Sequence, residues 1–329
     1  MDGESMYNFN SVAVEHFQFG MEKYFEGLFQ QAKAEFLMAL ESDDRIVLAY
    51  CYLSSIYCDY DNDFDTAIAL CRQGIEIEFL NPFLHFCLGS ALDVSGSKRE
   101  ALKEYEIYNN YFPDNAEGAF SIGCAYDSLG DKEGAEQYYL ETIRCDPNHY
   151  ISCFNLALLY SETGREREAI RMLRKVVEIN PIYWKAWVKL GILNSKCGNV
   201  DRAIEAYNHT IALRPELSDV CYNLGISYSL KGQYFSAMLA FKKSLELEDK
   251  DPDAWYNLGV CYIELEEFSS ARKALQRAIY YCLDHEEAHY RLGNLYILIG
   301  ERDKAENERK FLKEIKSSLC EALSEMLIA

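Results

Sequence analysis

The sequence repeats itself every 34 residues, and this period restricts the possible folds more than any other feature. The segment DAWYNLGVCYIELEEFSSARKALQRAI, from Asp253, aligns with DVCYNLGISYSLKGQYFSAMLAFKKSL, from Asp219. Self-similarity at a period of about 20 to 50 residues is typical of chains that stack one supersecondary unit. Nine frames follow from it, the second with one extra residue: 13–46, 47–81, 82–115, 116–149, 150–183, 184–217, 218–251, 252–285 and 286–319.

Each frame predicts two antiparallel helices. Apolar residues at positions 4, 7, 8 and 11, and again at 20, 24, 27 and 28, follow the spacing of an amphipathic helix. Alanine occupies position 20 in all frames, and small residues at positions 8 and 20 allow two helices to approach closely. Glycine at position 15 ends the first helix, and proline at position 32 ends the second. The residues at position 8 are Gly20, Ser54, Gly89, Gly123, Ala157, Gly191, Gly225, Gly259 and Gly293.

The pattern closely resembles the W–LG–Y–A–F–A–P signature of the tetratricopeptide repeat (TPR) family. The resemblance implies an all-α, right-handed superhelical solenoid of about nine tandem helix-turn-helix repeats, because one hairpin cannot bury its apolar faces alone. Departures fall in the terminal frames, where Phe19, Lys23 and Arg309 replace the usual residues. We expect residues 1–12 to form a lead-in and residues 320–329 to end a C-terminal capping helix.

In the TPR family, a stripe on the first helix of each repeat lines a concave groove. Positions 5 and 6 of this stripe carry aromatic, amide and basic side chains here. An asparagine amide can donate to and accept from the backbone of an extended peptide, and asparagine ladders occur in TPR regions such as that of O-linked N-acetylglucosamine transferases. The alternative is that these asparagines bond only to neighbouring groups of their own chain. The predicted groove residues are Asn155, Lys185, Lys189, Asn223, Asn257, Arg291, Phe154, Tyr222, Tyr256 and Tyr290.

Lys185 and Lys189, with Asn155, also resemble part of the carboxylate clamp of chaperone-binding TPR proteins. The clamp takes a lysine and an asparagine from its first helix, where this chain has Phe120 and Cys124. The clamp is therefore incomplete, and the sequence favours a different kind of peptide recognition.

The charge of −20 argues against binding to nucleic acid, whose phosphates need a basic surface. Residues 1–149 carry a net charge of −18 and residues 150–329 one of −2, so the acidic half either steers a basic partner or simply faces solvent. The start MDGESMYNFN lacks a basic, apolar signal, and no apolar run reaches the roughly 20 residues of a membrane span. We expect a cytoplasmic protein whose 12 cysteines are scattered, reduced thiols without a CxxC pair.

Two motifs suggest metal binding, and the repeat register explains each of them better. His285 to His289 spells HExxH, but His285 is the last residue of one frame and His289 occupies a packing position of the next. Asp59, Asp61, Asp63 and Asp65 alternate as in a calcium loop, without its glycine and bidentate glutamate. The sequence predicts no metal, no cofactor and no catalytic site.

The residues from Asp303 to Ala329 are predicted to continue as helix, with Leu312, Leu319 and Leu323 among those on one side. This helix either caps the last repeat or forms a contact for a homo-oligomer or partner. We expect a non-enzymatic scaffold that binds protein segments in its groove. Two alternatives remain open: a self-assembling structural protein, and the TPR part of a larger enzyme complex such as a glycosyltransferase.

Overall fold

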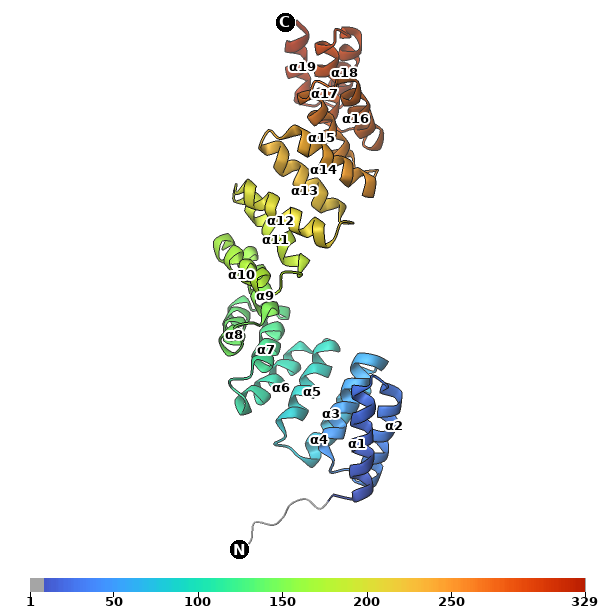
Figure 1. Ribbon diagram of the computed structural model, residues 1–329, viewed down its shortest axis with the longest axis vertical. Helices are drawn as coiled ribbons and strands as arrows, with labels where there is room; N and C mark the ends of the chain where they lie inside the picture. Colours follow the sequence, from blue (N-terminus) through green and yellow to red (C-terminus); the bar gives the residue numbers. More distant parts are fainter. Residues whose placement is uncertain (1–8, 329) are drawn as a thin grey trace. The chain divides into compact units, whose positions relative to one another are not determined.

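The computed structural model describes residues 9–328, which form helices and turns without any β-strand (Figure 1). Its contacts divide the chain into two compact units, Met1–Glu162 and Thr163–Ala329, which we call unit 1 and unit 2. Within residues 9–328, no helix is both long and apolar enough to cross a bilayer.

The described part of unit 1, residues 9–162, contains nine α-helices, and consecutive helices pack against each other as hairpins (Figure 1). They are α1 (Ser11–Phe25), α2 (Phe29–Ser42), α3 (Val47–Ile56), α4 (Phe64–Ile77), α5 (Pro82–Val94), α6 (Lys98–Tyr111), α7 (Ala116–Ser128), α8 (Lys132–Cys145) and α9 (Tyr150–Glu162). A short π-helix, η1 (Tyr57–Asp61), follows α3.

Unit 2 begins with a single helix and continues with hairpins of the same kind (Figure 1). Its helices are α10 (Glu166–Ile179), α11 (Trp184–Lys196), α12 (Val200–Leu213), α13 (Ser218–Leu230), α14 (Tyr234–Leu247), α15 (Pro252–Glu264), α16 (Phe268–Tyr281), α17 (Glu286–Leu298), α18 (Arg302–Glu314) and α19 (Leu319–Ile328). From α3 to α17, every odd-numbered helix begins at the first residue of a frame.

The turn between the two helices of a hairpin contains a residue in the left-handed backbone conformation. The seven glycines at position 15 have φ between 69° and 93°, a range in which a Cβ atom is strained. Asn62 (φ 54°) and Glu266 (φ 60°) adopt the same conformation where the sequence has no glycine. The extra residue of the second frame is absorbed in η1, as single π-helical turns commonly absorb insertions.

The two helices of a hairpin meet where position 8 of the first faces position 24 of the second. A Cβ atom on Gly225 would lie 2.6 Å from the ring of Phe241, and one on Gly191 would overlap the ring of Tyr207. Both rings are fully buried or nearly so. The absence of a side chain at position 8 therefore sets how closely the paired helices approach.

The C-terminus differs from the continuous helix that we predicted. α18 ends at Glu314, Lys316 has φ 58°, and α19 begins at Leu319 after a turn. α19 packs against α17 and α18, and its fully buried Leu323 would lie 2.6 Å from a Cβ atom on Gly293. Leu323 thus occupies the space that an aromatic residue at position 24 would fill in an earlier hairpin.

The predicted lead-in, residues 1–12, lies mostly outside the described residues, since these begin at residue 9 and α1 begins at Ser11. Ala329, at the end of the predicted cap, also lies outside them.

Replacing Gly225 by alanine tests the close approach within a hairpin. We expect Gly225→Ala to lower the free energy of unfolding by about 1–3 kcal/mol, because Phe241 must shift in a closely packed interior. The chain itself suggests the compensating change, since Ala157 at position 8 goes with Leu173 at position 24. In urea unfolding, Gly225→Ala/Phe241→Leu should therefore lower the free energy of unfolding by less than the sum of the two single changes. Additive costs would contradict this account.

Truncating Leu323 tests the cap. We expect Leu323→Ala to cost about 2–4 kcal/mol, because it leaves a cavity above Gly293. Hydrogen–deuterium exchange should accelerate first in α17–α19 and leave α11–α14 unchanged, since a solenoid unfolds locally from its ends. The exposed Glu325→Ala in the same helix is the control. Equal exchange in both variants would show that α19 does not protect the last hairpin.

Candidate functional site

In unit 2, the first helices of successive repeats are α11, α13, α15 and α17. Each of them contacts the first helix of the next repeat. A hydrogen bond of 3.1 Å from Asn257 Nδ2 to the hydroxyl of Tyr222 joins α15 to α13 at positions 6 and 5. Positions 5 and 6 of successive first helices therefore lie next to one another on one surface. We call it the first-helix face; its residues are Lys185, Lys189, Ile192, Tyr222, Asn223, Ile226, Leu230, Tyr256, Asn257, Val260, Tyr290 and Arg291.

Asn223 and Asn257, the two asparagines of this face, differ in the number of hydrogen bonds that their side chains already make. Asn257 uses its amide N–H groups on the Tyr222 hydroxyl and, at 2.8 Å, on the carbonyl oxygen of Asp253. Its side-chain oxygen accepts no hydrogen bond from residues 9–328, and within the same range the whole Asn223 amide lacks a partner. Asn223 thus offers a donor and an acceptor, whereas Asn257 offers an acceptor.

The tyrosines give this face its apolar area. Tyr222 is half-buried, packs edge-on against Phe241 with ring centres 5.7 Å apart, and burial raises the pKa of its hydroxyl. The Tyr256 ring lies 5.1 Å from that of His285. The Tyr290 hydroxyl lies 3.8 Å from the sulfur of Met326 in α19, so the cap approaches the face at this end.

The predicted cations lie at the two ends of the face. Lys185 and Lys189 are exposed on α11, with the ammonium of Lys185 5.9 Å from the Trp184 ring centre. Arg291 is exposed on α17. Among the described residues none of the three has a carboxylate within 4.0 Å, so all three can attract an anionic group.

Asn155 and Phe154 belong to unit 1, on α9. Asn155 Nδ2 lies 3.5 Å from the Tyr139 hydroxyl and 4.0 Å from the sulfur of Cys124, and burial raises the pKa of that thiol to about 11. Phe154 was predicted for the groove, and the structure leaves only 8% of this residue exposed.

One exposed residue of the stripe was not among the predicted groove residues. Leu230, at position 13 of α13, is 66% exposed and follows Tyr222 and Ile226 at the four-residue spacing of one helix face. Ile192 on α11 is 41% exposed. The sequence did contain a signal for Leu230. The stripe of Tyr222 and Ile226 continues for one more helical turn, and an apolar leucine stands there at an exposed position.

The HExxH residues have structural partners. His289 Nδ1 lies 2.6 Å from the Glu308 carboxylate and Nε2 lies 3.0 Å from the carbonyl oxygen of Leu283, so both ring nitrogens are occupied. His285 caps α17 by accepting from the N–H of Ala288. His85 repeats the arrangement of His289, with Nδ1 2.6 Å from Glu104. The motif is thus a packing device of the repeat.

The acidic turn is also occupied by protein groups. Asp61 accepts from Lys33 and Gln30, and Asp63 caps α4 by accepting from Thr66. Within residues 9–328, no three His, Cys, Asp or Glu side chains are placed to hold a metal ion together.

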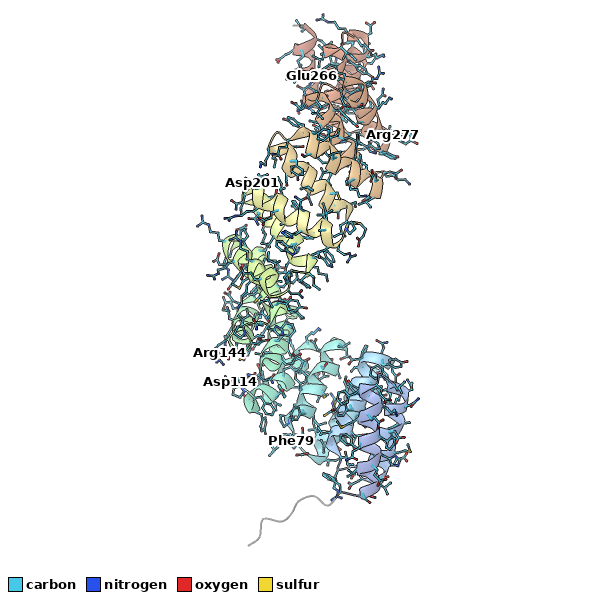
Figure 2. All side chains as sticks on the ribbon, viewed as in Figure 1. Phe79, Asp114, Arg144, Asp201, Glu266 and Arg277 are labelled. Atoms are coloured by element: carbon cyan, nitrogen blue, oxygen red, sulfur yellow. The ribbon has the colours of Figure 1, made fainter. Side chains whose placement is uncertain are left out.

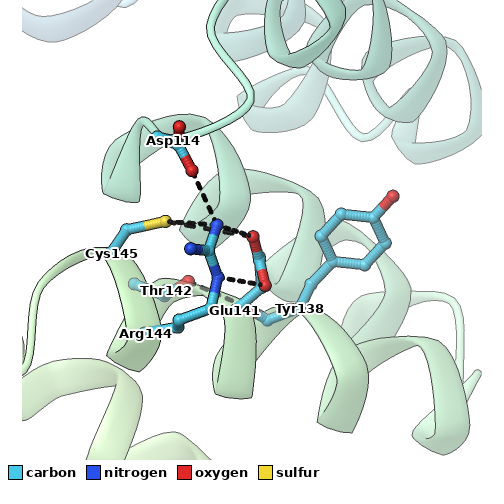
Figure 3. A network of polar contacts seen from close by, with 6 residues as sticks. All are labelled: Asp114, Tyr138, Glu141, Thr142, Arg144 and Cys145. Carbon is cyan, nitrogen blue, oxygen red and sulfur yellow. Dashed lines mark hydrogen bonds and ion pairs between the residues drawn. The ribbon is translucent and has the colours of Figure 1, made fainter.

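Polar networks elsewhere connect neighbouring elements on the surface. In unit 1, Arg144 of α8 bonds to Glu141 at 2.6 Å and to Asp114, before α7, at 2.7 Å (Figure 3). Arg144 and Asp114 are largely exposed, so water screens the pair and its contribution to stability is small.

Comparison with known proteins agrees with this architecture. The tetratricopeptide repeat pattern matches residues 116–149 and 150–183, and that of the anaphase-promoting complex, cyclosome, subunit 3 matches residues 196–278. No curated protein matches the sequence significantly.

Solved structures of TPR type share the fold at low sequence identity. PilW, titled a widely conserved type IV pilus biogenesis factor, is 20% identical with a TM-score of 0.57, covering 63% of this chain and 95% of its own. YrrB, titled a TPR protein with an unusual peptide-binding site, is 20% identical with a TM-score of 0.53, covering 56% and 95%. A tetratricopeptide repeat protein from Parabacteroides merdae is 20% identical with a TM-score of 0.50, covering 76% and 98%. With its 34-residue frames, its helix hairpins and these matches, the chain has the fold of tetratricopeptide repeat proteins, and residues 116–183 match the repeat itself.

Proposed function

We propose that the protein is a non-enzymatic scaffold that binds an extended peptide segment of a partner on the first-helix face of unit 2. The observation that carries this proposal is the hydrogen bond from Asn257 to Tyr222, which aligns two successive repeats. Beside it, the Asn223 amide and the Asn257 oxygen are left for a ligand.

Such a face suits a peptide backbone. An extended segment presents N–H and C=O groups at regular spacing, and the two asparagines can bond to these groups without reading the sequence. Tyr222, Ile226 and Leu230 lie on one stripe of α13 and can cover apolar side chains of the same segment. The exposed Lys189 and Arg291 favour a segment with carboxylates toward either end.

The alternatives of self-assembly and of a place in an enzyme complex receive less support. α19 buries Leu323 against its own chain, which favours a capping role over a dimer contact. The histidines of the HExxH motif are hydrogen-bonded within the repeat, which argues against a zinc-hydrolase site at this motif.

Replacing both asparagines tests the proposal. Partners should be captured from a lysate by wild type and identified by mass spectrometry, and a peptide array should then locate the bound segment. We expect Asn223→Ala/Asn257→Ala to lower the affinity for that segment about tenfold or more, since each lost hydrogen bond is worth about 0.5–1.5 kcal/mol.

The control is Asn110→Ala/Asn148→Ala, which removes two exposed asparagines from unit 1. Circular dichroism should show that both double variants are folded and helical at the temperature of the binding assay. Equal affinity of the wild type and the Asn223→Ala/Asn257→Ala protein would remove the first-helix face from the binding site.

A further inference from the structure

A second surface of unit 2, separate from the first-helix face, carries three equivalent grooves. Each is bounded by two successive second helices and floored by the first helix between them. They lie over α11, α13 and α15 and have volumes of about 380, 330 and 380 Å³. Their lining residues recur at the same positions of the 34-residue frame, so the grooves follow from the packing of the repeat.

The groove over α15 has an aromatic floor. Trp255 and Tyr262 line it, with Leu245, Leu258 and Ala274. The indole N–H of Trp255 donates to the carbonyl oxygen of Asp249 at 2.7 Å, which fixes the ring and leaves its face to the groove. Large rigid rings beside aliphatic side chains form the kind of pocket in which a partner's apolar side chain is held.

Cations surround this groove. Lys242 and Lys273 stand on its two walls, both exposed, and neither has a carboxylate within 4.0 Å among residues 9–328. The one acidic lining residue, Glu246, is paired with Lys243 at 3.2 Å. Arg277 of α16, labelled in Figure 2, lies 6.0 Å from the Trp255 ring centre. The walls therefore carry an uncompensated positive charge in a chain of net charge −20.

The other two grooves show that this charge is specific to one end of the unit. At the positions of Lys242 and Lys273, the groove over α11 has Arg174 and Glu205, a pair of opposite charge. The groove over α13 has Asn208 and Leu239 there, and no acidic residue lines it. Only the groove over α15 combines an indole floor with two unpaired lysines.

We propose that the grooves on both sides of α14 form a second binding surface for an acidic peptide segment with apolar anchors. One anchor lies against Trp255 and Tyr262, and carboxylates beside it pair with Lys242 and Lys273. A second anchor enters the apolar groove over α13, against Leu224 and Leu239. Because a helix is about 10 Å wide and extended residues advance about 3.3 Å each, the anchors are about three residues apart.

The proposal is independent of the first-helix face, because the surface uses the second helices α12, α14 and α16 and the floor of the first helices between them. The scaffold would therefore hold two segments at once. Charge attraction also makes the affinity depend on ionic strength, since surface charges are screened over about 8 Å at physiological salt.

A designed probe tests this surface in the full-length protein. The probe is a fluorescein-labelled twelve-residue peptide with two leucines three positions apart among aspartates and glutamates, measured by fluorescence anisotropy. We expect binding that weakens about tenfold in Lys242→Glu/Lys273→Glu, because attraction becomes repulsion. Arg174→Glu/Arg202→Glu, which reverses exposed charges on the equivalent groove, is the matched control and should change the affinity by less than about threefold.

Further arms distinguish other outcomes. Peptides with lysines in place of the acids, or serines in place of the leucines, should bind at least about tenfold more weakly. Asn223→Ala/Asn257→Ala should leave the affinity unchanged, and a loss there would place the probe on the first-helix face. No binding, or equal affinity of the wild type and Lys242→Glu/Lys273→Glu for the probe, would overturn the proposal. So would a wild-type dimer in sedimentation that Lys242→Glu/Lys273→Glu abolishes, because a second copy would then occupy the surface.

Discussion

The structure depends on the close approach of two helices at one position of the repeat. Position 8 lacks a bulky side chain, so a ring or leucine from position 24 can lie directly on the helix backbone, as Phe241 lies on Gly225. This contact buries the largest side chains of the interior, including Tyr139, Tyr207 and Phe36. Because protein interiors are close-packed, the contact fixes the helix spacing in each hairpin and hence the surface available to the next one.

The same constraint explains why the last hairpin looks different. Arg309 stands at position 24, and a charged residue cannot replace an aromatic one in a buried contact. Leu323 reaches Gly293 from α19 instead, while Arg309 pairs with Glu306 at 2.6 Å at the surface. A terminal repeat has no following neighbour, so the chain supplies the missing apolar side chain from a separate short helix.

The features that recur in the repeat were predictable from the sequence, because the same residue types stand at the same positions of several frames. The frames, the glycine turns and the position of the paired helices follow from one period and from side-chain size. Features that occur once were not predictable. The turn at Lys316 has no glycine or proline to announce it, and the π-helical turn at Tyr57–Asp61 follows only from how an extra residue happens to be accommodated.

The sequence pointed to residues of the candidate site, but it did not predict their contacts. Position 6 pointed to Asn223 and Asn257, yet the sequence could not show that Asn257 donates to Tyr222 of the preceding repeat, because that bond joins residues 35 apart. It also could not show that Phe154 is buried while Leu230 is exposed. Exposure depends on neighbouring helices, whereas the repeat pattern reports only which positions the packing requires.

The first-helix face and the grooves between the second helices both follow from the same packing of the repeat. Positions 9 and 13 of the first helices and positions 22 and 25 of the second helices lie outside the contact between positions 8 and 24. They can change without loss of fold, and they do: Lys242 and Lys273 stand where another repeat has Arg174 and Glu205. Residues 1–162 carry a net charge of −19 and residues 163–329 one of −1, so a small number of unpaired cations is enough to make one groove of unit 2 attractive to acidic segments.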